Sequence, residues 1–177
     1  AAEGARVAPV LDRILAKQEL VVGTAASMPP LNMTMKDGQI VGLEVDLARF
    51  LADGLGVKLT LKRIQFNELI PALEAGQVDM ILSGMTITPA RNLKAAFVGP
   101  YFVSGKSILA KKASIESMRE ISQINNSDKV LAALRGSTSQ IFSEKVFPKD
   151  KLVLTDDYDQ GVAMVLEEKG HAMVADH

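Results

Sequence analysis

Residues 83–91 of this 177-residue chain read SGMTITPAR and follow the short apolar run VDMIL at residues 78–82. An apolar run of this length that ends in Ser-Gly predicts a buried parallel strand followed by a loop. Thr88 is expected to cap a helix with Pro89 in its first position, which places Arg91 in the first turn. The loop then lies at the carboxyl end of a strand, where open α/β sheets bind ligands.

Arg91 has two interpretations at this point. Arginine binds a carboxylate with two parallel hydrogen bonds, so Arg91 is a candidate ligand-binding residue. The same side chain is also compatible with a solvated helix face. The residue types alone leave both interpretations open.

Helical and extended patterns alternate along the chain before this stretch. The predicted elements are a helix at 7–17, a strand at 19–23, a hairpin at 31–43, a helix at 44–55, a strand at 57–64, a helix capped by Asn67 and the strand at 78–82. This strand-helix order with short connections predicts an α/β fold with a doubly wound sheet.

The same order starts afresh after an extended segment at 102–111. The predicted elements are a helix near 115–121, a strand at 129–134, a helix at 140–146, a strand at 152–154, a helix capped by Asp157 and a strand at 172–175. Ser137 and Thr138 follow Gly136 at the start of a predicted helix, whose free N–H groups favour an anion. Asp176 follows the last strand.

Two anion-binding loops and one acidic residue suit a zwitterionic ligand, with Arg91 for its carboxylate and Asp176 for its ammonium group. The alternatives are that Ser137 and Thr138 simply cap their helix, and that Asp176 is a solvated carboxylate.

The composition excludes several classes of function. A net charge of −1 gives no clustered basic field, so we expect neither a nucleic-acid partner nor a lipid-surface partner. The chain has no cysteine, which excludes thiolate metal sites and a cysteine nucleophile. No histidine and carboxylate cluster has metal-ligand spacing, and no glycine-rich phosphate fingerprint is present, so we expect no metal and no cofactor.

Many short stretches together carry a family resemblance. They cover nearly the whole chain from Leu20 onward: GLEVDL at 42–47, LA at 51–52, FNELIPAL at 66–73, DM at 79–80, GMTIT at 84–88, Arg91, PY at 100–101, GST at 136–138 and AMVAD at 172–176. This co-linear set resembles the family 3 extracellular solute-binding proteins, the polar amino-acid receptors of ABC importers.

The resemblance implies a two-lobe type II periplasmic-binding-protein-like fold that closes on its ligand by a hinge motion. Lobe 1 is expected at 1–104, a hinge crossing strand at 105–112 and a partial lobe 2 at 113–177. Compared with the family, the second lobe and the C-terminal return to lobe 1 are expected to be incomplete. The apolar face left uncovered would favour a homodimer or a domain swap.

The resemblance also implies a ligand site. The carboxylate clamp falls on Arg91, helped by Thr86 and Thr138, with Ser137 beside it. The ammonium partners fall on the carbonyl of Gly84 and on Asp176. The side-chain pocket falls on Met28 and Phe66, with Ala25 and Leu31 as neighbours.

Two pocket positions depart from the family pattern. Many relatives have an acidic residue in place of Ala25 and an aromatic ring in place of Met28, so we expect a less polar pocket for an uncharged side chain. Met28 is equally compatible with a flexible gap-filler that does not touch the ligand.

The function implied by the resemblance is a non-catalytic periplasmic binding protein that captures an amino acid or similar small zwitterion and delivers it to an ABC permease. The chain starts without a basic region and apolar core, so we expect a removed signal peptide. Two alternatives stay open, the sensor domain of a membrane receptor kinase and a cyclohexadienyl-dehydratase-like enzyme. Both histidines lie near the chain end, and His171 is expected at the surface, which weighs against acid-base chemistry.

Overall fold

The computed structural model describes residues 8–112, 125, 128–148 and 150–176. None of the helices in these ranges is long and apolar enough to cross a membrane. The chain divides into two compact units, one formed by Ala1–Ile64 and Leu69–Ser83, the other by Gln65–Glu68 and Gly84–His177. The helix predicted near 115–121 lies outside the described residues, and the lobe boundaries stay a prediction.

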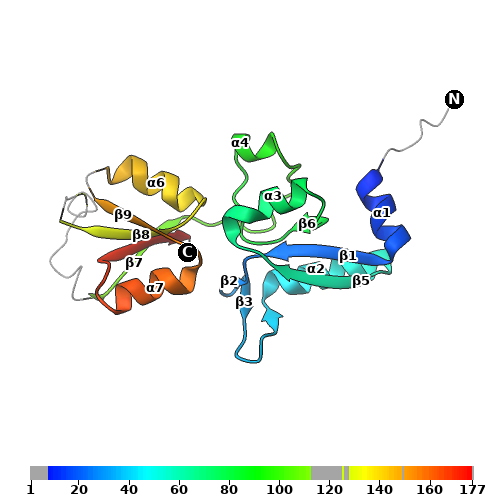
Figure 1. Cartoon of the computed structure of the whole chain (residues 1–177), viewed down its shortest axis with the longest axis horizontal. Helices are drawn as coiled ribbons and strands as arrows, with labels where there is room; N and C mark the ends of the chain where they lie inside the picture. Colours follow the sequence, from blue (N-terminus) through cyan, green and yellow to red (C-terminus); the bar gives the residue numbers. More distant parts are fainter. Residues whose placement is uncertain (1–7, 113–124, 126–127, 149, 177) are drawn as a thin grey trace. The chain divides into compact units, whose positions relative to one another are not determined.

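A parallel sheet in the order β5-β1-β6 forms the centre of the first unit (Figure 1). Its strands are β1 (Glu19–Thr24), β5 (Lys58–Arg63) and β6 (Met80–Ile81). Helix α2 (Leu43–Leu55) precedes β5, and α3 (Leu69–Glu74) precedes β6. Because β1 lies between the other two strands, the chain winds first to one side and then to the other. The predicted doubly wound sheet is therefore confirmed for this unit.

The elements that flank this sheet also agree with the sequence patterns. Helix α1 (Pro9–Lys17) leads into β1, and three short antiparallel strands form the predicted hairpin region. These strands are β2 (Ser27–Met28), β3 (Asn32–Thr34) and β4 (Ile40–Val41).

The core of the first unit is apolar, and one groove on its surface is apolar too. One cluster of buried side chains in this core consists of Ile14, Leu20, Val22, Ala48, Ala52, Val57 and Leu82. A groove of about 500 Å³ is lined by α1, α2 and β6, and exposed Val10, Leu11 and Leu55 lie along it. Exposed apolar surface of this kind favours association with another surface.

A mixed sheet in the order β7-β10-β8-β9 forms the centre of the second unit. Its strands are β7 (Lys106–Ala110), β8 (Val130–Leu134), β9 (Lys151–Thr155) and β10 (Ala172–Asp176). β7 pairs with β10 in antiparallel orientation, whereas β10 with β8 and β8 with β9 are parallel pairs. Helices α6 (Thr138–Val146) and α7 (Tyr158–Leu166) cover opposite faces of this sheet (Figure 1).

The parallel strands of the second unit repeat the winding of the first. In β9-β8-β10, as in β5-β1-β6, the first strand along the chain lies between the second and the third. Each sheet therefore has a topological switch point beside its first strand, at the carboxyl ends of two strands. In the second unit these are the ends of β8, which leads to Gly136, and of β10, whose last residue is Asp176.

One predicted helix start is wrong. Asn67 does not cap α3, because it lies inside a 3₁₀ turn, η1 (Phe66–Glu68), that leads directly into the helix. Its side-chain Nδ2 donates to Oε1 of Glu68 at 2.8 Å. The 3₁₀ turn thus replaces the extended cap residue that the sequence pattern predicted.

Candidate functional site

The short helix α4 (Pro89–Asn92) carries Arg91. Thr88 has extended backbone angles, and its Oγ1 accepts a hydrogen bond from the backbone N–H of Arg91 at 3.2 Å. Pro89 takes the first helical position, where its missing N–H costs nothing. The predicted cap and the predicted place of Arg91 in the first turn are both confirmed.

The guanidinium of Arg91 is held by backbone carbonyls and an aromatic ring. Nη1 donates to the carbonyl of Thr86 at 2.8 Å, and Nη2 donates to the carbonyl of Gly136 at 2.9 Å. Its central carbon lies 5.5 Å from the ring centroid of Phe66, a buried side chain. These contacts fix the plane of the guanidinium and include a cation–π contact.

The electrostatic environment of Arg91 has two opposing contributions. Burial lowers the pKa of Arg91 below its ordinary value, and the negative charge of Asp176 counteracts that shift. Arginine keeps its proton at neutral pH in proteins, so the side chain stays a cation. A partly desolvated cation attracts an anion more strongly than a fully solvated one does.

The loop before α6 is built around two residues with different roles. Gly136 has a φ of +74°, and a Cβ there would lie only 3.0 Å from Cβ of Asn67, so the position favours glycine. Ser137 caps α6, since its Oγ accepts from the N–H of Gln140 at 3.2 Å and donates to the carbonyl of Leu134 at 2.7 Å. The Ser137 hydroxyl is thus used within the fold.

The hydroxyl of Thr138 connects two parts of the predicted clamp. Its Oγ1 lies 3.2 Å from Oγ1 of Thr86 and accepts a hydrogen bond from Nζ of Lys106 at 2.7 Å. The structure therefore brings Thr86 and Thr138 together, as the resemblance implied.

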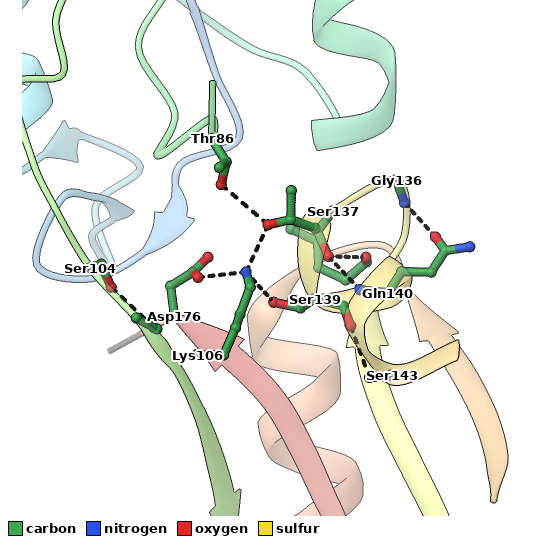
Figure 2. A network of polar contacts seen from close by, with 12 residues as sticks. Thr86, Ser104, Lys106, Gly136, Ser137, Ser139, Gln140, Ser143 and Asp176 are labelled. Atoms are coloured by element: carbon green, nitrogen blue, oxygen red, sulfur yellow. Dashed lines mark hydrogen bonds and ion pairs between the residues drawn. The ribbon is translucent and has the colours of Figure 1, made fainter. Parts of the chain in front are cut away.

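Lys106 is the residue that the sequence analysis missed. Its Nζ donates to Oγ1 of Thr138, and Figure 2 shows its contacts to Ser139 and Asp176. The distance to Oδ1 of Asp176 is 2.6 Å, and the two side chains are 22% and 16% exposed. Lys106 lies directly opposite Asp176 in the antiparallel pair of β7 and β10. Asp176 therefore already has a cationic partner from the chain itself.

Tyr158 at the start of α7 is a second residue near this cluster that the sequence did not single out. Burial raises the pKa of Tyr158, and the negative charge of Asp176 raises it further. Its phenol stays neutral over the physiological range, so it adds no charge to the site.

Met28 is positioned by a separate set of contacts in the first unit. Oδ1 of Asn32 accepts hydrogen bonds from the N–H groups of Ser27 and Met28 at 3.0 and 3.3 Å. Nδ2 of Asn32 donates to Oε2 of buried Glu44 at 2.5 Å. Met28 belongs to the first unit, whereas the other predicted site residues, Phe66, Gly84, Thr86, Arg91, Ser137, Thr138 and Asp176, belong to the second.

His171 has a structural role. Its half-buried imidazole accepts a hydrogen bond at Nδ1 from the N–H of Val130 at 3.0 Å. Within the described ranges, no group of three or more histidine, aspartate or glutamate side chains is placed to hold a metal ion. The chemistry that the site offers is ionic and hydrogen-bonding, with two cations, one carboxylate and several hydroxyls.

The chain matches a protein-family model and several known proteins. Residues 20–172 match the family model described as bacterial extracellular solute-binding proteins, family 3. The chain is similar to ABC transporter arginine-binding protein 1 of Escherichia coli (strain K12), at 29% identity over 81% of this chain and 57% of that protein. It is similar to the glutamine-binding protein of Geobacillus stearothermophilus, at 29% identity over 94% of this chain and 64% of that protein.

A solved structure is also similar. The ancestral amino acid-binding protein AncCDT-1, a precursor of cyclohexadienyl dehydratase, matches with a TM-score of 0.91 and 36% identity over 94% of this chain and 73% of that chain. Such neighbours have the type II periplasmic-binding fold that the sequence analysis predicted. The chain spans less than two thirds of the length of the two curated relatives above.

Proposed function

Because the chain belongs to the bacterial extracellular solute-binding proteins of family 3, we propose that it captures an amino acid or a similar small carboxylate-bearing solute. Delivery of that solute to an ABC permease in the membrane is part of the same proposal. The printed names of the relatives, which are arginine-, glutamine- and amino acid-binding proteins, support this class of ligand.

The observation that carries the proposal is the environment of Arg91. The two hydrogen bonds to the carbonyls of Thr86 and Gly136 use two of the five N–H donors of a guanidinium. The remaining donors suit a ligand carboxylate, which arginine binds in a planar, bidentate way. The hydroxyls of Thr86 and Thr138 lie next to each other, and Thr86 contacts Arg91, so both hydroxyls would add hydrogen bonds to the ligand carboxylate.

The other predicted residues complete the proposed site. Phe66 would pack against the ligand beside Arg91, and Gly84 and Asp176 would lie near its second polar group. Met28 would line the side-chain pocket. Ser137 would contribute through the N-terminus of α6, because its hydroxyl is used in the cap.

We also propose a periplasmic location and a non-catalytic role. The family is one of extracellular proteins, and the relatives named above are binding proteins, which supports both. Recovery of a bound ligand unchanged after prolonged incubation, measured by mass spectrometry, tests the absence of catalysis. Association into a homodimer or a domain swap stays a prediction, and the apolar groove along α1 is consistent with it.

The test of the proposed function is Arg91→Ala, assayed by thermal shift and calorimetry against the common amino acids and a set of small carboxylic acids. Removing one partner of a buried charge pair costs about 2–5 kcal/mol, so the dissociation constant should rise at least about 30-fold. The matched control is Arg49→Ala, because Arg49 is exposed and pairs with exposed Asp46 at 3.0 Å.

We expect Arg49→Ala to bind like the wild type. Wild-type affinity in Arg91→Ala would contradict the clamp. A folded wild type that binds none of these compounds would contradict the proposed function itself.

A further inference from the structure

The ammonium group of Lys106 is fully hydrogen-bonded by side chains of the second unit. Nζ donates to Oδ1 of Asp176 at 2.6 Å, to Oγ1 of Thr138 at 2.7 Å and to Oγ of Ser139 at 3.0 Å (Figure 2). A lysine ammonium has three N–H donors, so each donor has an acceptor.

The hydrogen bonds of Lys106 are held in place by the fold around them. Lys106 and Asp176 are register partners on neighbouring strands, and both side chains are largely shielded from solvent. Thr138 and Ser139 belong to the first turn of α6, which Ser137 caps. Backbone pairing and a capped helix therefore fix all four groups.

One carboxylate with two hydroxyls is also the set of acceptors that the α-ammonium of a bound amino acid would need. In the proposed site Asp176 is the acidic group available to such an ammonium. Lys106 already occupies it. A ligand ammonium must either displace Lys106 from three hydrogen bonds or approach a second positive charge closely, and both are unfavourable.

A ligand without an ammonium group meets no such conflict. Its carboxylate still binds Arg91, and an oxo or hydroxyl group at carbon 2 can hydrogen-bond with the hydroxyl of Thr86 or Thr138. Arg91, Lys106 and Asp176 together carry one net positive charge, which favours an anionic ligand over a zwitterion of the same shape.

We propose that Lys106 is a specificity-determining residue that fills the ammonium subsite beside Asp176, so that the protein selects 2-oxo or 2-hydroxy acids over the matching α-amino acids. The inference rests on the proposed function, since it assumes that Arg91 binds the ligand carboxylate.

The test is calorimetry with matched sets of acids that share a side chain and differ only at carbon 2. One set is leucine, its 2-oxo acid and its 2-hydroxy acid, and the corresponding sets of alanine and glutamate are measured in the same way. We expect the wild type to bind the oxo or hydroxy acid of its preferred set at least about tenfold more tightly than the amino acid. Lys106→Met keeps the length of the side chain and removes the charge. It should bind the amino acid more tightly than the wild type does and reverse the preference.

Two further variants make the result specific. Lys111→Met removes a lysine that follows the same strand and pairs with Glu168 at 2.8 Å, and it should keep the wild-type preference. The double variant Lys106→Met with Asp176→Asn removes both charges of the pair, so it avoids a buried carboxylate without its cation should the single variant fail to fold. Its affinities for the two classes of acid should approach one another.

The outcomes distinguish a failure of the role of Lys106 from a failure of the proposed function. A wild type that prefers the amino acid, or a preference that survives in both Lys106 variants, would overturn the role of Lys106 while binding through Arg91 stands. Absence of binding by every acid in every set would overturn both.

Discussion

Gly161 of α7 lies against Met173 of β10, with no room between them for a side chain. A Cβ built on Gly161 would clash with Sδ of Met173 and lie 2.7 Å from its Cε. Because Met173 is fully buried, its Sδ and Cε can move away only if neighbouring core side chains move as well. This close approach lets α7 pack directly onto the strand that ends at Asp176.

Gly161→Ala is expected to destabilise the protein although alanine is the better helix former. Overpacking of a tight core position typically costs about 1–3 kcal/mol, which exceeds the gain of about 1 kcal/mol in helix propensity. The matched control is Gly54→Ala in α2, where a Cβ meets nothing within 4 Å and the propensity gain should appear alone.

Chemical denaturation of both variants measures the two effects. Gly161→Ala should lower the free energy of unfolding, and Gly54→Ala should raise it by about 0.5–1 kcal/mol. Equal shifts in the same direction would mean that α7 can move away from β10.

Thr88→Ala is expected to weaken both the fold and the proposed binding. It removes the hydroxyl that accepts the N–H of Arg91, and loss of such a cap costs about 0.5–2 kcal/mol. Because α4 is only four residues long, the backbone under Arg91 should lose its fixed place. Denaturation and ligand titration measure the two effects, with Thr88→Ser as the control that keeps the hydroxyl. Unchanged ligand affinity in Thr88→Ala would show that the cap does not position the guanidinium.

Tyr158→Phe is expected to change how stability depends on alkaline pH. Burial and the charge of Asp176 raise the pKa of Tyr158 above its ordinary value of 10.0, so the folded state keeps the proton that the unfolded state releases. The raised pKa contributes fully to the free energy of unfolding below pH 10.0, the ordinary pKa of tyrosine. This contribution is lost as the pH rises toward the pKa of the folded state. The free energy of unfolding should therefore fall more steeply between about pH 9 and pH 11 in the wild type than in the variant. Parallel slopes in denaturant titrations across this range would contradict the raised pKa.

Features that depend on one residue and its immediate neighbours could be predicted from the sequence. Thr88 and Asp157 were both predicted as helix caps, and each accepts the N–H of a residue three positions on. The carboxyl ends of β6, β8 and β10 were predicted to within one residue by the same kind of local signal.

The sequence could not predict features that depend on distant partners. Lys106 reads as an ordinary lysine in an extended segment, because its contact with Asp176 depends on the register between β7 and β10 across 70 residues. Asparagine is a common helix-capping residue, but Asn67 lies inside the 3₁₀ turn that begins at Phe66. Pairing and packing between elements, rather than propensity, set both positions.

The repeated strand order of the two sheets has a consequence for how such a protein can change during evolution. Each switch point lies beside loops, while most residues of the two buried clusters lie within strands and helices. Substitutions in the loops after β1, β6 and β8 can alter what is recognised without disturbing either core. New specificities are therefore accessible to this scaffold one loop at a time.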